Sequence, residues 1–328
     1  MQQTIEKDKF LTSVRKWWHR VGQKADSWSK KGGPVRRKMY LNRTLYFMML
    51  PYLILFFAFT VIPVLMSLAL SFTSYNILEA PKIIGWTNYL TLFLDDEIFI
   101  TAIKNTLILA VITGPIGYIA AFVIAWLINE LPGKLRSIVT LAFYAPSLSA
   151  NALVIWTLIF SSDIYGYANA FLLEWGFITE PQTWLTNTTY ILPIVIVVQL
   201  WMSLGVGFLS LVAGLKSVNK ELYEAGAIDG IRNRWQELWY ITLPAMKPQL
   251  IFSAVMQISG TLGIGGITVA LAGFPSVSYA AHTIVNHLAD YGGIRYEMGY
   301  ASAIATLLFI SSIALNKLIR RMIRRVGE

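Results

Sequence analysis

Long apolar runs constrain this chain more than any other feature of its sequence. Six of them approach the roughly 20 residues that a helix needs to cross the hydrocarbon core of a bilayer. They cover about residues 45–70, 99–128, 138–160, 190–215, 250–271 and 299–319. Apolar residues make up 55% of the chain and charged residues only 14%, a balance typical of membrane proteins. Because a helix satisfies its own backbone hydrogen bonds in lipid, the sequence predicts an all-α integral membrane protein with six spans.

Glycine and proline interrupt several of these runs. Gly114-Pro115 lies in the second run, Pro146 lies in the third, and the fifth carries Gly260, Gly263, Gly265 and Gly266. Such residues are tolerated at membrane depth where neighbouring helices satisfy the freed backbone groups and small side chains allow close packing. The glycines of the fifth run are equally compatible with a break that lines a cavity.

The positive charges fall almost entirely on one side of the predicted spans. Of the 27 Lys and Arg residues, all but Lys82, Lys104 and Arg295 lie in the tails, in the loop between the second and third runs, or in residues 214–247. Cytoplasmic loops of membrane proteins carry such an excess. The bias predicts that both termini and the loop 217–248 are cytoplasmic. It also accounts for the net charge of +9 without nucleic acid as a partner.

The same pattern divides the chain into a basic cytoplasmic tail, a six-span domain with an internal loop, and a second basic tail. Their bounds are 1–44, 45–321 (with the loop at 217–248) and 322–328. Trp residues interleave with Lys and Arg from Phe10 to Trp28, which suits an amphipathic helix lying on anionic membrane lipid. A solvated tail broken at Gly32-Gly33-Pro34 fits equally well, and both interpretations stay open.

The internal loop is a polar, helix-prone island between two apolar runs. Asn219 is a residue type that caps helices, and Glu221 follows in the first turn, where the helix macrodipole favours an anion. Gly230 tolerates left-handed geometry and can stop this helix. A second helical piece is predicted to end at Pro244, which cannot donate to a helical ladder. The small residues Ala225, Gly226 and Ala227 let another surface approach closely, so the loop predicts a short helix presented for docking.

Short motifs in this loop resemble the EAA loop of binding-protein-dependent ABC importer permeases. The matching residues are Glu224-Ala225-Gly226, Asp229-Gly230, Ile241-Thr242-Leu243-Pro244 and Pro248. The Asp-Gly pair and the following Trp235-Gln236 are most similar to the sugar branch of that family, the maltose and oligosaccharide type. Two positions depart from the family pattern: Gly226 and Ile231 both stand where Ala is usual. Gly226 keeps its position small.

The resemblance implies a type I ABC importer permease architecture, with six transmembrane helices, in a bacterial inner membrane. In that family the loop forms a cytoplasmic coupling helix seated in a groove of the ATPase. The resemblance implies that the residues coupling this chain to the ATPase are Glu224, Ala225, Gly226, Asp229 and Gly230. The implied partners are a second homologous permease subunit forming a heterodimer, an ATPase dimer, an extracellular or periplasmic solute-binding protein, and a sugar ligand. ATP and Mg would belong to the ATPase, and this chain would hold no cofactor.

Several kinds of chemistry are missing from the sequence. It has no Gly-x-x-x-x-Gly-Lys-Ser/Thr phosphate loop, so the energy for transport must come from another chain. No Asp, Glu, Lys or Arg lies at the centre of a predicted span, which disfavours an ion-coupled secondary carrier. Hydrolase and metalloprotease signatures are also missing. We therefore predict a transport subunit rather than an enzyme, with a scaffold that does not transport as a further alternative.

Two polar groups on the outer side are assigned no chemistry. Asp95, Asp96 and Glu97 form a charge run typical of a solvated helix start. His282 and His287 are five residues apart, a spacing that does not align them on one helical face. We therefore predict solvated or interfacial histidines and no metal site.

A sugar path needs neutral hydrogen-bonding groups and aromatic faces at membrane depth. The candidates are Asn151, Gln199, Gln257, Tyr144 and Trp201. The three amides could instead form hydrogen bonds between helices of the bundle, and the partner permease could hold the whole substrate site. A non-sugar solute such as a polyol phosphate is the alternative cargo.

Overall fold

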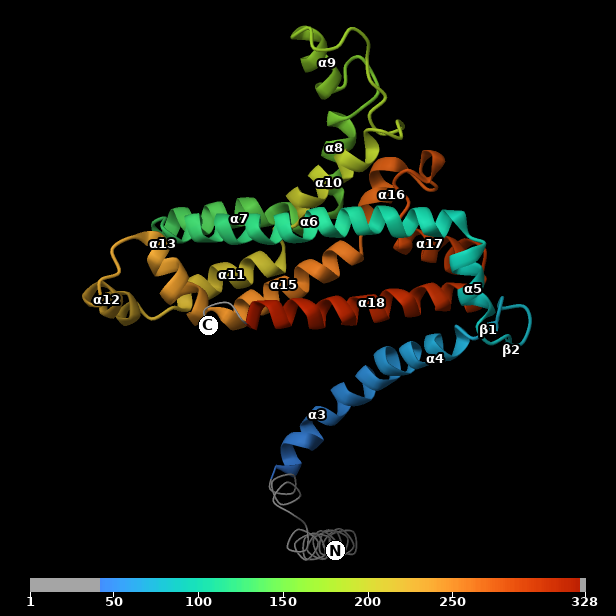
Figure 1. Cartoon of the computed structure of the whole chain (residues 1–328), viewed down its shortest axis with the longest axis horizontal. Coiled ribbons are helices and arrows are strands. Elements are labelled where there is room, and N and C mark those ends of the chain that lie inside the picture. The colour runs from blue at the N-terminus through green and yellow to red at the C-terminus, as the bar shows by residue number, and fades with distance from the viewer. Residues whose placement is uncertain (1–41, 325–328) are drawn as a thin grey trace, which may run out of the picture. The chain divides into compact units, whose positions relative to one another are not determined.

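The computed structural model describes residues 42–324 (Figure 1). The hypotheses about a helix over Phe10–Trp28 and about the last four residues of the C-terminal tail lie outside this range. Within it, the chain is helical apart from one short hairpin and the connecting loops. The chain falls into two units, one up to Met66 and one from Ser67 onward.

The first unit contains an apolar helical segment that continues into the second. The segment consists of α3 (Arg43–Phe56), a π-helical turn (Phe57–Val61) and α4 (Ile62–Leu70). Pro63 is the second residue after the turn, and its missing N–H and bulky ring would break a regular α-helix. Here the amide of Ile62 bonds to the carbonyl of Phe57, five residues back. The widened turn therefore lets the helix pass the proline.

In the second unit, the end of α4 is followed by an antiparallel hairpin and then by helices. Its strands are β1 (Thr73–Ser74) and β2 (Lys82–Ile83), with Thr73 opposite Ile83 and Ser74 opposite Lys82. The longer helices are α6 (Glu97–Asn129), α7 (Gly133–Leu148), α10 (Ile191–Met202), α11 (Val206–Ser217), α15 (Lys247–Leu262) and α18 (Met298–Arg324). The shorter helices are α5 (Thr87–Leu94), α8 (Leu153–Ile159), α9 (Tyr167–Glu174), α12 (Lys220–Ile228), α13 (Arg234–Glu237), α14 (Leu243–Ala245), α16 (Gly266–Ala272) and α17 (Ile284–Ala289). Single 3₁₀ or π turns lie at Ala150–Ala152, Leu238–Thr242, Val277–Tyr279 and Asp290–Ile294.

The described residues contain four helical segments long and apolar enough to cross a membrane. These lie at 43–70, 97–129, 191–217 and 298–323, and two bent helix pairs raise the number to six if each pair is one span. α7 meets α8 at 83°, and α15 meets α16 at 42°. The second bend falls at Gly263–Gly265, so the glycine-rich run does contain a break. By contrast, α6 continues unbroken through Gly114-Pro115.

The helix α15 is central to the packing of the second unit, because it contacts α6, α11 and α18 (Figure 1). In one core cluster, Phe208 and Leu211 of α11 are fully buried together with Ala121 and Ala125 of α6 and with Met246. The small alanines allow the larger side chains of α11 to approach α6 closely. At one end of these helices lie α12 and α13, and at the other lie α5, α17 and the hairpin.

Asp96 joins three helices at the end of the second unit that carries the hairpin. Its side chain accepts the Phe99 amide at 2.8 Å and so caps α6. Its Oδ2 also accepts the Tyr300 hydroxyl of α18 at 2.8 Å and lies 3.0 Å from Nε2 of His287 in α17. The expectation of a solvated charge run is therefore wrong for Asp96, whose side chain is only 9% exposed. A buried carboxylate persists here because it is hydrogen-bonded on several sides.

The two outer histidines are buried rather than solvated. His282 and His287 are each 1% exposed, and their Nε2 and Nδ1 atoms lie 3.3 Å apart. The helical spacing argument failed because His282 precedes α17 in a turn, so the pair does not share one helix. Burial lowers the pKa of His282 to about 4, and the neighbouring His287 acts in the same direction. Burial also lowers the pKa of His287, although Asp96 opposes that shift.

We expect acid to weaken the fold through His282. Its pKa is about 4 in the folded chain, against an ordinary value of 6.5. Between these values the unfolded chain binds a proton that the folded chain does not. The contribution to stability is therefore complete above about pH 6.5 and is lost as the pH falls toward 4. Thermal unfolding in detergent, followed by tryptophan fluorescence, should show Tm falling across this window.

The variant His282→Gln is the control, because it removes the titrating ring and keeps a polar side chain. Burial raises the pKa of Asp96, but hydrogen bonds from Phe99, Tyr300 and His287 outweigh that effect and leave it below 3.8, outside the window. The decline of Tm should therefore be smaller in His282→Gln than in the wild type. Equal declines would show that His282 does not contribute.

Candidate functional site: the loop between Ser217 and Pro248

The helix α12 has a complete cap at each end. Asn219 accepts a hydrogen bond from a backbone amide of the first turn, which confirms the predicted N-cap. At the other end Gly230 has a φ of +91°. The Ile231 amide bonds to the Gly226 carbonyl at 2.9 Å, and the Gly230 amide lies 3.4 Å from the Ala227 carbonyl. This is a Schellman motif, which favours glycine because it needs a left-handed residue.

Gly226 is small because the loop packs against itself at this position. A Cβ atom added there would lie 2.6 Å from Cδ1 of Ile241 and 3.1 Å from Cδ1 of Ile231. Gly226 is also the buried residue of α12. Another surface does approach this small residue closely, and that surface consists of the chain's own isoleucines. The departure from the usual Ala is matched by these neighbouring side chains.

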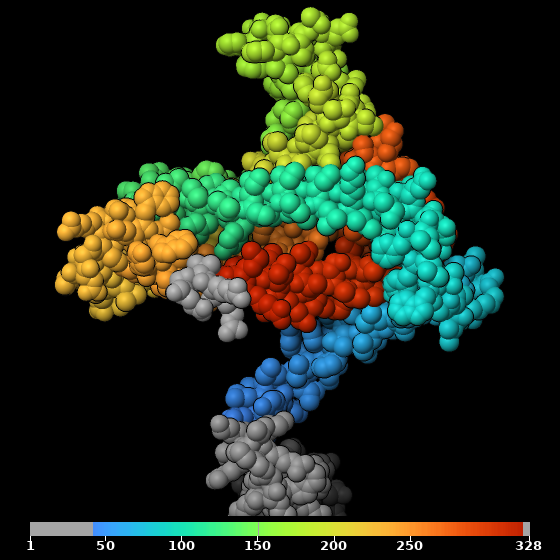
Figure 2. Space-filling view, in the orientation of Figure 1, coloured from blue at the N-terminus to red at the C-terminus, as the bar shows by residue number. Residues whose placement is uncertain are grey.

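The opposite face of α12 is open. Glu224, Ala225 and Asp229 are exposed, and Ile228 has 88% of its surface exposed. Further along the loop, Trp235 is 70% exposed. Figure 2 shows this segment standing out at one end of the second unit. Exposed apolar side chains gathered beside charged ones are typical of a protein interaction surface.

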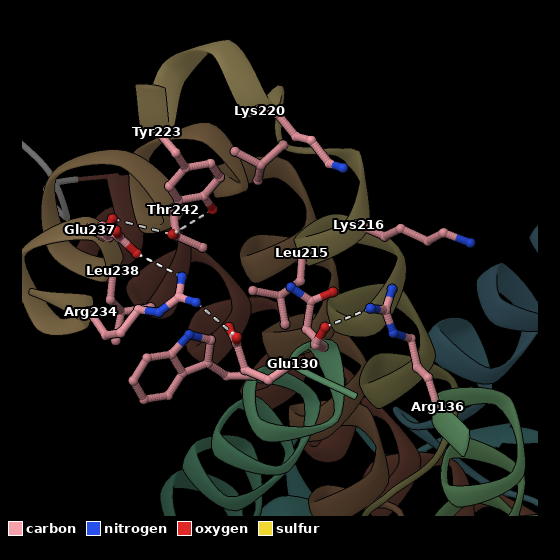
Figure 3. A pocket seen from close by; sticks show the side chains of 13 residues that line it. Glu130, Arg136, Leu215, Lys216, Lys220, Tyr223, Arg234, Glu237, Leu238 and Thr242 are labelled. Carbon is pink, nitrogen blue, oxygen red and sulfur yellow. Dashed lines mark hydrogen bonds and ion pairs between the residues drawn. The ribbon is translucent and has the colours of Figure 1, made fainter. Parts of the chain in front are cut away.

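Polar contacts attach the loop to the helical bundle (Figure 3). Arg234 bridges Glu237, at 2.9 Å, to Glu130 at the end of α6, at 3.0 Å. Tyr223 of α12 shares a hydrogen bond of 2.9 Å with Thr242, which is buried. The first contact ties the loop to the end of α6, and the second ties α12 to the π-helical turn of the same loop.

The second helical piece of the loop passes through Pro244 rather than ending there. After α13 the helix widens into the π-helical turn Leu238–Thr242 and continues as α14. In this turn the Leu243 amide bonds to the carbonyl of Leu238, five residues back. A π-helical turn also precedes Pro63. The prediction failed because proline excludes the regular α-helical pattern, and the chain continues here by widening into a π-helical turn instead.

Sequence reasoning missed the residues that hold the loop in place. Glu130 and Arg234 are 104 positions apart, so no spacing rule connects them. Trp126 of α6 and Trp235 of the loop are also in ring contact, with centroids 5.3 Å apart. Their separate tryptophan signals are typical of membrane interfaces and do not reveal that the two rings meet.

The five path candidates lie on four different segments. Asn151 is exposed at the bend between α7 and α8, and Tyr144 lies on α7. Gln199 is 6% exposed on α10, and Trp201 of the same helix stands edge-on to Trp156 at 5.5 Å. Gln257 of α15 donates from Nε2 to the Thr113 carbonyl of α6 at 3.1 Å. That bond is the interhelical alternative for Gln257, so its role in a path stays a prediction.

Trp201 also lines an apolar cavity. The cavity has a volume of about 400 Å³ and lies between α6, α7 and α10, with Phe143 and Pro146 among its walls. Its size falls within the range of small-ligand sites, but sugar sites also need polar groups that converge on the ligand.

Comparison with known proteins identifies the family. A profile described as the binding-protein-dependent transport system inner membrane component matches residues 114–327. The chain is 33% identical, over 88% of its length and 92% of the relative's, to the probable ABC transporter permease protein YesP of Bacillus subtilis. It is 30% identical, over 81% of its length and 83% of the relative's, to the arabinooligosaccharides transport system permease protein AraP of the same organism.

A solved structure agrees with these relatives. The chain resembles a subunit of a bacterial ABC transporter involved in the import of the acidic polysaccharide alginate, with a TM-score of 0.72 and 27% identity. The match covers 90% of this chain and 99% of the other. The chain therefore belongs to the binding-protein-dependent transport system inner membrane components, the permease subunits of ABC importers.

Proposed function

We propose that this permease carries an oligosaccharide across the membrane, driven by a separate ATPase that docks on the exposed face of α12. The observation that carries the proposal is the construction of that helix. Both of its ends are capped, Gly226 is packed beneath Ile241, and Glu224 and Ala225 face outward. A helix fixed in this way can transmit a push from a partner without losing its shape.

Packing contributes more to this connection than the ion pairs do. The Arg234 side chain is 64% exposed and that of Glu130 is 49% exposed, and exposed pairs contribute about 0–1 kcal/mol. The contact of Ile241 with Gly226 and the buried Thr242 connect α12 to the segment that leads into α15. We therefore assign the transmission of movement to this packed contact. The free energy that shifts the permease between its conformations would come from different contacts of α12 with the open and closed ATPase.

The proposed topology has six spans with both termini in the cytoplasm of a bacterial cell, in the inner membrane. It takes the two bent pairs α7–α8 and α15–α16 as one span each. Arg136, Lys216 and Arg234 gather at the same end of the second unit as α12, which supports the orientation given by the charge bias. The domain bounds 45–321 and the tails on either side follow from this topology.

The proposed cargo is a carbohydrate. AraP is named for arabinooligosaccharides, and LacF of Rhizobium radiobacter, 28% identical over 69% of this chain and 74% of its own length, is named for lactose. These names favour a sugar over a polyol phosphate, and the lack of charged residues at the centres of the spans disfavours an ion-coupled carrier. Gln199, Tyr144 and Trp201 remain the candidates for contact with the sugar, together with Asn151 and Gln257.

The proposed assembly contains four kinds of chain. A solved alginate transporter, similar to this chain at a TM-score of 0.71 and 27% identity, was determined in complex with an alginate pentasaccharide-bound periplasmic protein. By analogy we propose an extracellular or periplasmic binding protein, a second permease subunit paired with this one as a heterodimer, and two ATPase subunits. ATP and Mg would be bound by the ATPase subunits alone.

The first of three predictions from this proposal concerns the exposed charge of α12. Glu224→Lys should lower ligand-stimulated ATP hydrolysis of the assembled complex by at least about fivefold. That factor corresponds to about 1 kcal/mol, the lower end of typical coupling free energies. The reason is that the reversed charge would face the docking groove. Glu174→Lys is the matched control, because Glu174 is an exposed glutamate of α9. If both variants hydrolyse ATP like the wild type, Glu224 has no part in coupling.

The second prediction concerns the packed face of the same helix. Gly226→Val should impair ligand-stimulated ATP hydrolysis, because its side chain would overlap Ile241. The double variant Gly226→Val with Ile241→Ala should recover part of the activity by restoring the space. Ala227→Val, at an exposed position, controls for the lower helix propensity of valine. Failure of the double variant to recover any activity would argue against the packed contact.

The third prediction concerns topology, and the chain is suited to it because it has no cysteine. In the variant Asn219→Cys, a thiol reagent that does not cross membranes should label the chain only after cells are permeabilised. In Thr179→Cys, on the segment between α9 and α10, it should label intact cells. Labelling of Asn219→Cys in intact cells would place the loop outside and overturn the docking proposal.

A further inference from the structure

A cavity of about 510 Å³ separates the loop from the bundle (Figure 3). Its walls come from the end of α6, the start of α7, the end of α11 and the segment from α12 to the π-helical turn. The volume falls within the range of small-ligand sites, about 300–1,000 Å³. The proposed docking face of α12 does not include this cavity, which lies on the loop's inner side.

Positive charge exceeds negative charge in this cavity. Its lining includes four cationic side chains and two carboxylates: Arg136, Lys216, Lys220 and Arg234, with Glu130 and Glu237. Both carboxylates pair with Arg234. Within residues 42–324, the other three cations have no carboxylate at ion-pair distance. Figure 3 shows these three side chains along the same side of the cavity.

Hydrogen bonds to the backbone fix the Arg136 side chain at the wall of the cavity. Its Nη2 donates to the Asn129 carbonyl at 2.7 Å and to the Leu131 carbonyl at 2.9 Å, which fixes the guanidinium at the turn between α6 and α7. Its Nε is buried and lacks a hydrogen-bond partner among the described residues. That nitrogen does not face the cavity, although the Arg136 side chain lines it. A guanidinium is always charged and suits the oxygens of a phosphate group, so an anion is the ligand class expected here.

The position of the cavity indicates which phosphate-bearing ligand could reach it. α6 ends at Asn129, α7 begins at Gly133 and α11 ends at Ser217, so the cavity lies where three membrane-crossing segments reach the interface. Trp126 also lines it, and tryptophan is enriched at the level of lipid headgroups. Basic pockets between helices at the cytoplasmic side suit anionic lipid headgroups.

We propose that this cavity binds the phosphate group of an anionic phospholipid of the cytoplasmic leaflet, between Arg136, Lys216 and Lys220. The proposal rests on the orientation given under the proposed function and assigns the transporter a lipid site. Lys220 belongs to α12, whereas Arg136 and Lys216 belong to the bundle. A bound phosphate therefore joins α12 to the bundle across the cavity, and anionic lipid supports the coupling of ATP hydrolysis to transport.

The experiment uses the complete transporter in nanodiscs of phosphatidylcholine, with and without phosphatidylglycerol. Native mass spectrometry counts the phosphatidylglycerol retained, and ATP hydrolysis is measured in parallel. The variant Lys216→Gln/Lys220→Gln should bind phosphatidylglycerol about 30-fold more weakly than the wild type, from about fivefold per lysine, and should lose any stimulation by that lipid. Lys134→Gln/Arg320→Gln removes the same charge from exposed positions outside the cavity and should behave like the wild type.

Three results would overturn the proposal. The first is equal retention of phosphatidylglycerol by wild type and cavity variant. The second is binding of inorganic phosphate or glycerol phosphate in phosphatidylcholine nanodiscs with no preference for the lipid, which would assign the site to a soluble phosphate compound. The third is loss of the ATPase from the cavity variant alone in both lipids, which would assign the cavity to a protein contact. If no ATPase assembles even with the wild type, the proposed function fails instead.

Discussion

Lipid offers no hydrogen-bond partner to a peptide group, and the rest of this structure depends on that constraint. It forces the long segments into helices and leaves polar chemistry to their ends. It also suits the way the apolar segment passes Pro63, where a π-helical turn keeps the amide of Ile62 hydrogen-bonded within the helix. Helix ends then become the places where partners, lipids and polar networks can act.

The two ends of the second unit use different physical means. At the hairpin end, the largely buried side chain of Asp96 connects α6, α17 and α18 through hydrogen bonds. At the opposite end, the charges of the loop are largely exposed, and each ion pair is individually weak. Close packing of Ile241 against Gly226 compensates there. One end is thus fixed by buried polar bonds, and the other is left open to a partner while its helix keeps its shape.

Sequence reasoning recovered the local features because their causes are local. The cap at Asn219, the left-handed Gly230 and the apolar runs each depend on residues a few positions apart. The same reasoning failed for His282 and His287, where burial is set by residues nearly 200 positions away, including Asp96. For Gly226 it predicted a close approach without its partner, because smallness alone does not say which surface approaches. For the path candidates, Gln257 shows that an amide at membrane depth can be occupied by a neighbouring helix.

The sequence by itself determined the membrane-spanning character, the orientation favoured by the charges, and the position of the helix α12, since these follow from composition and short-range pattern. Only the tertiary structure decided what supports that helix. The contact of Ile241 with Gly226, the bridge from Arg234 to Glu130 and the cationic cavity behind them all join distant segments. Such contacts depend on how helices pack, which no local pattern encodes.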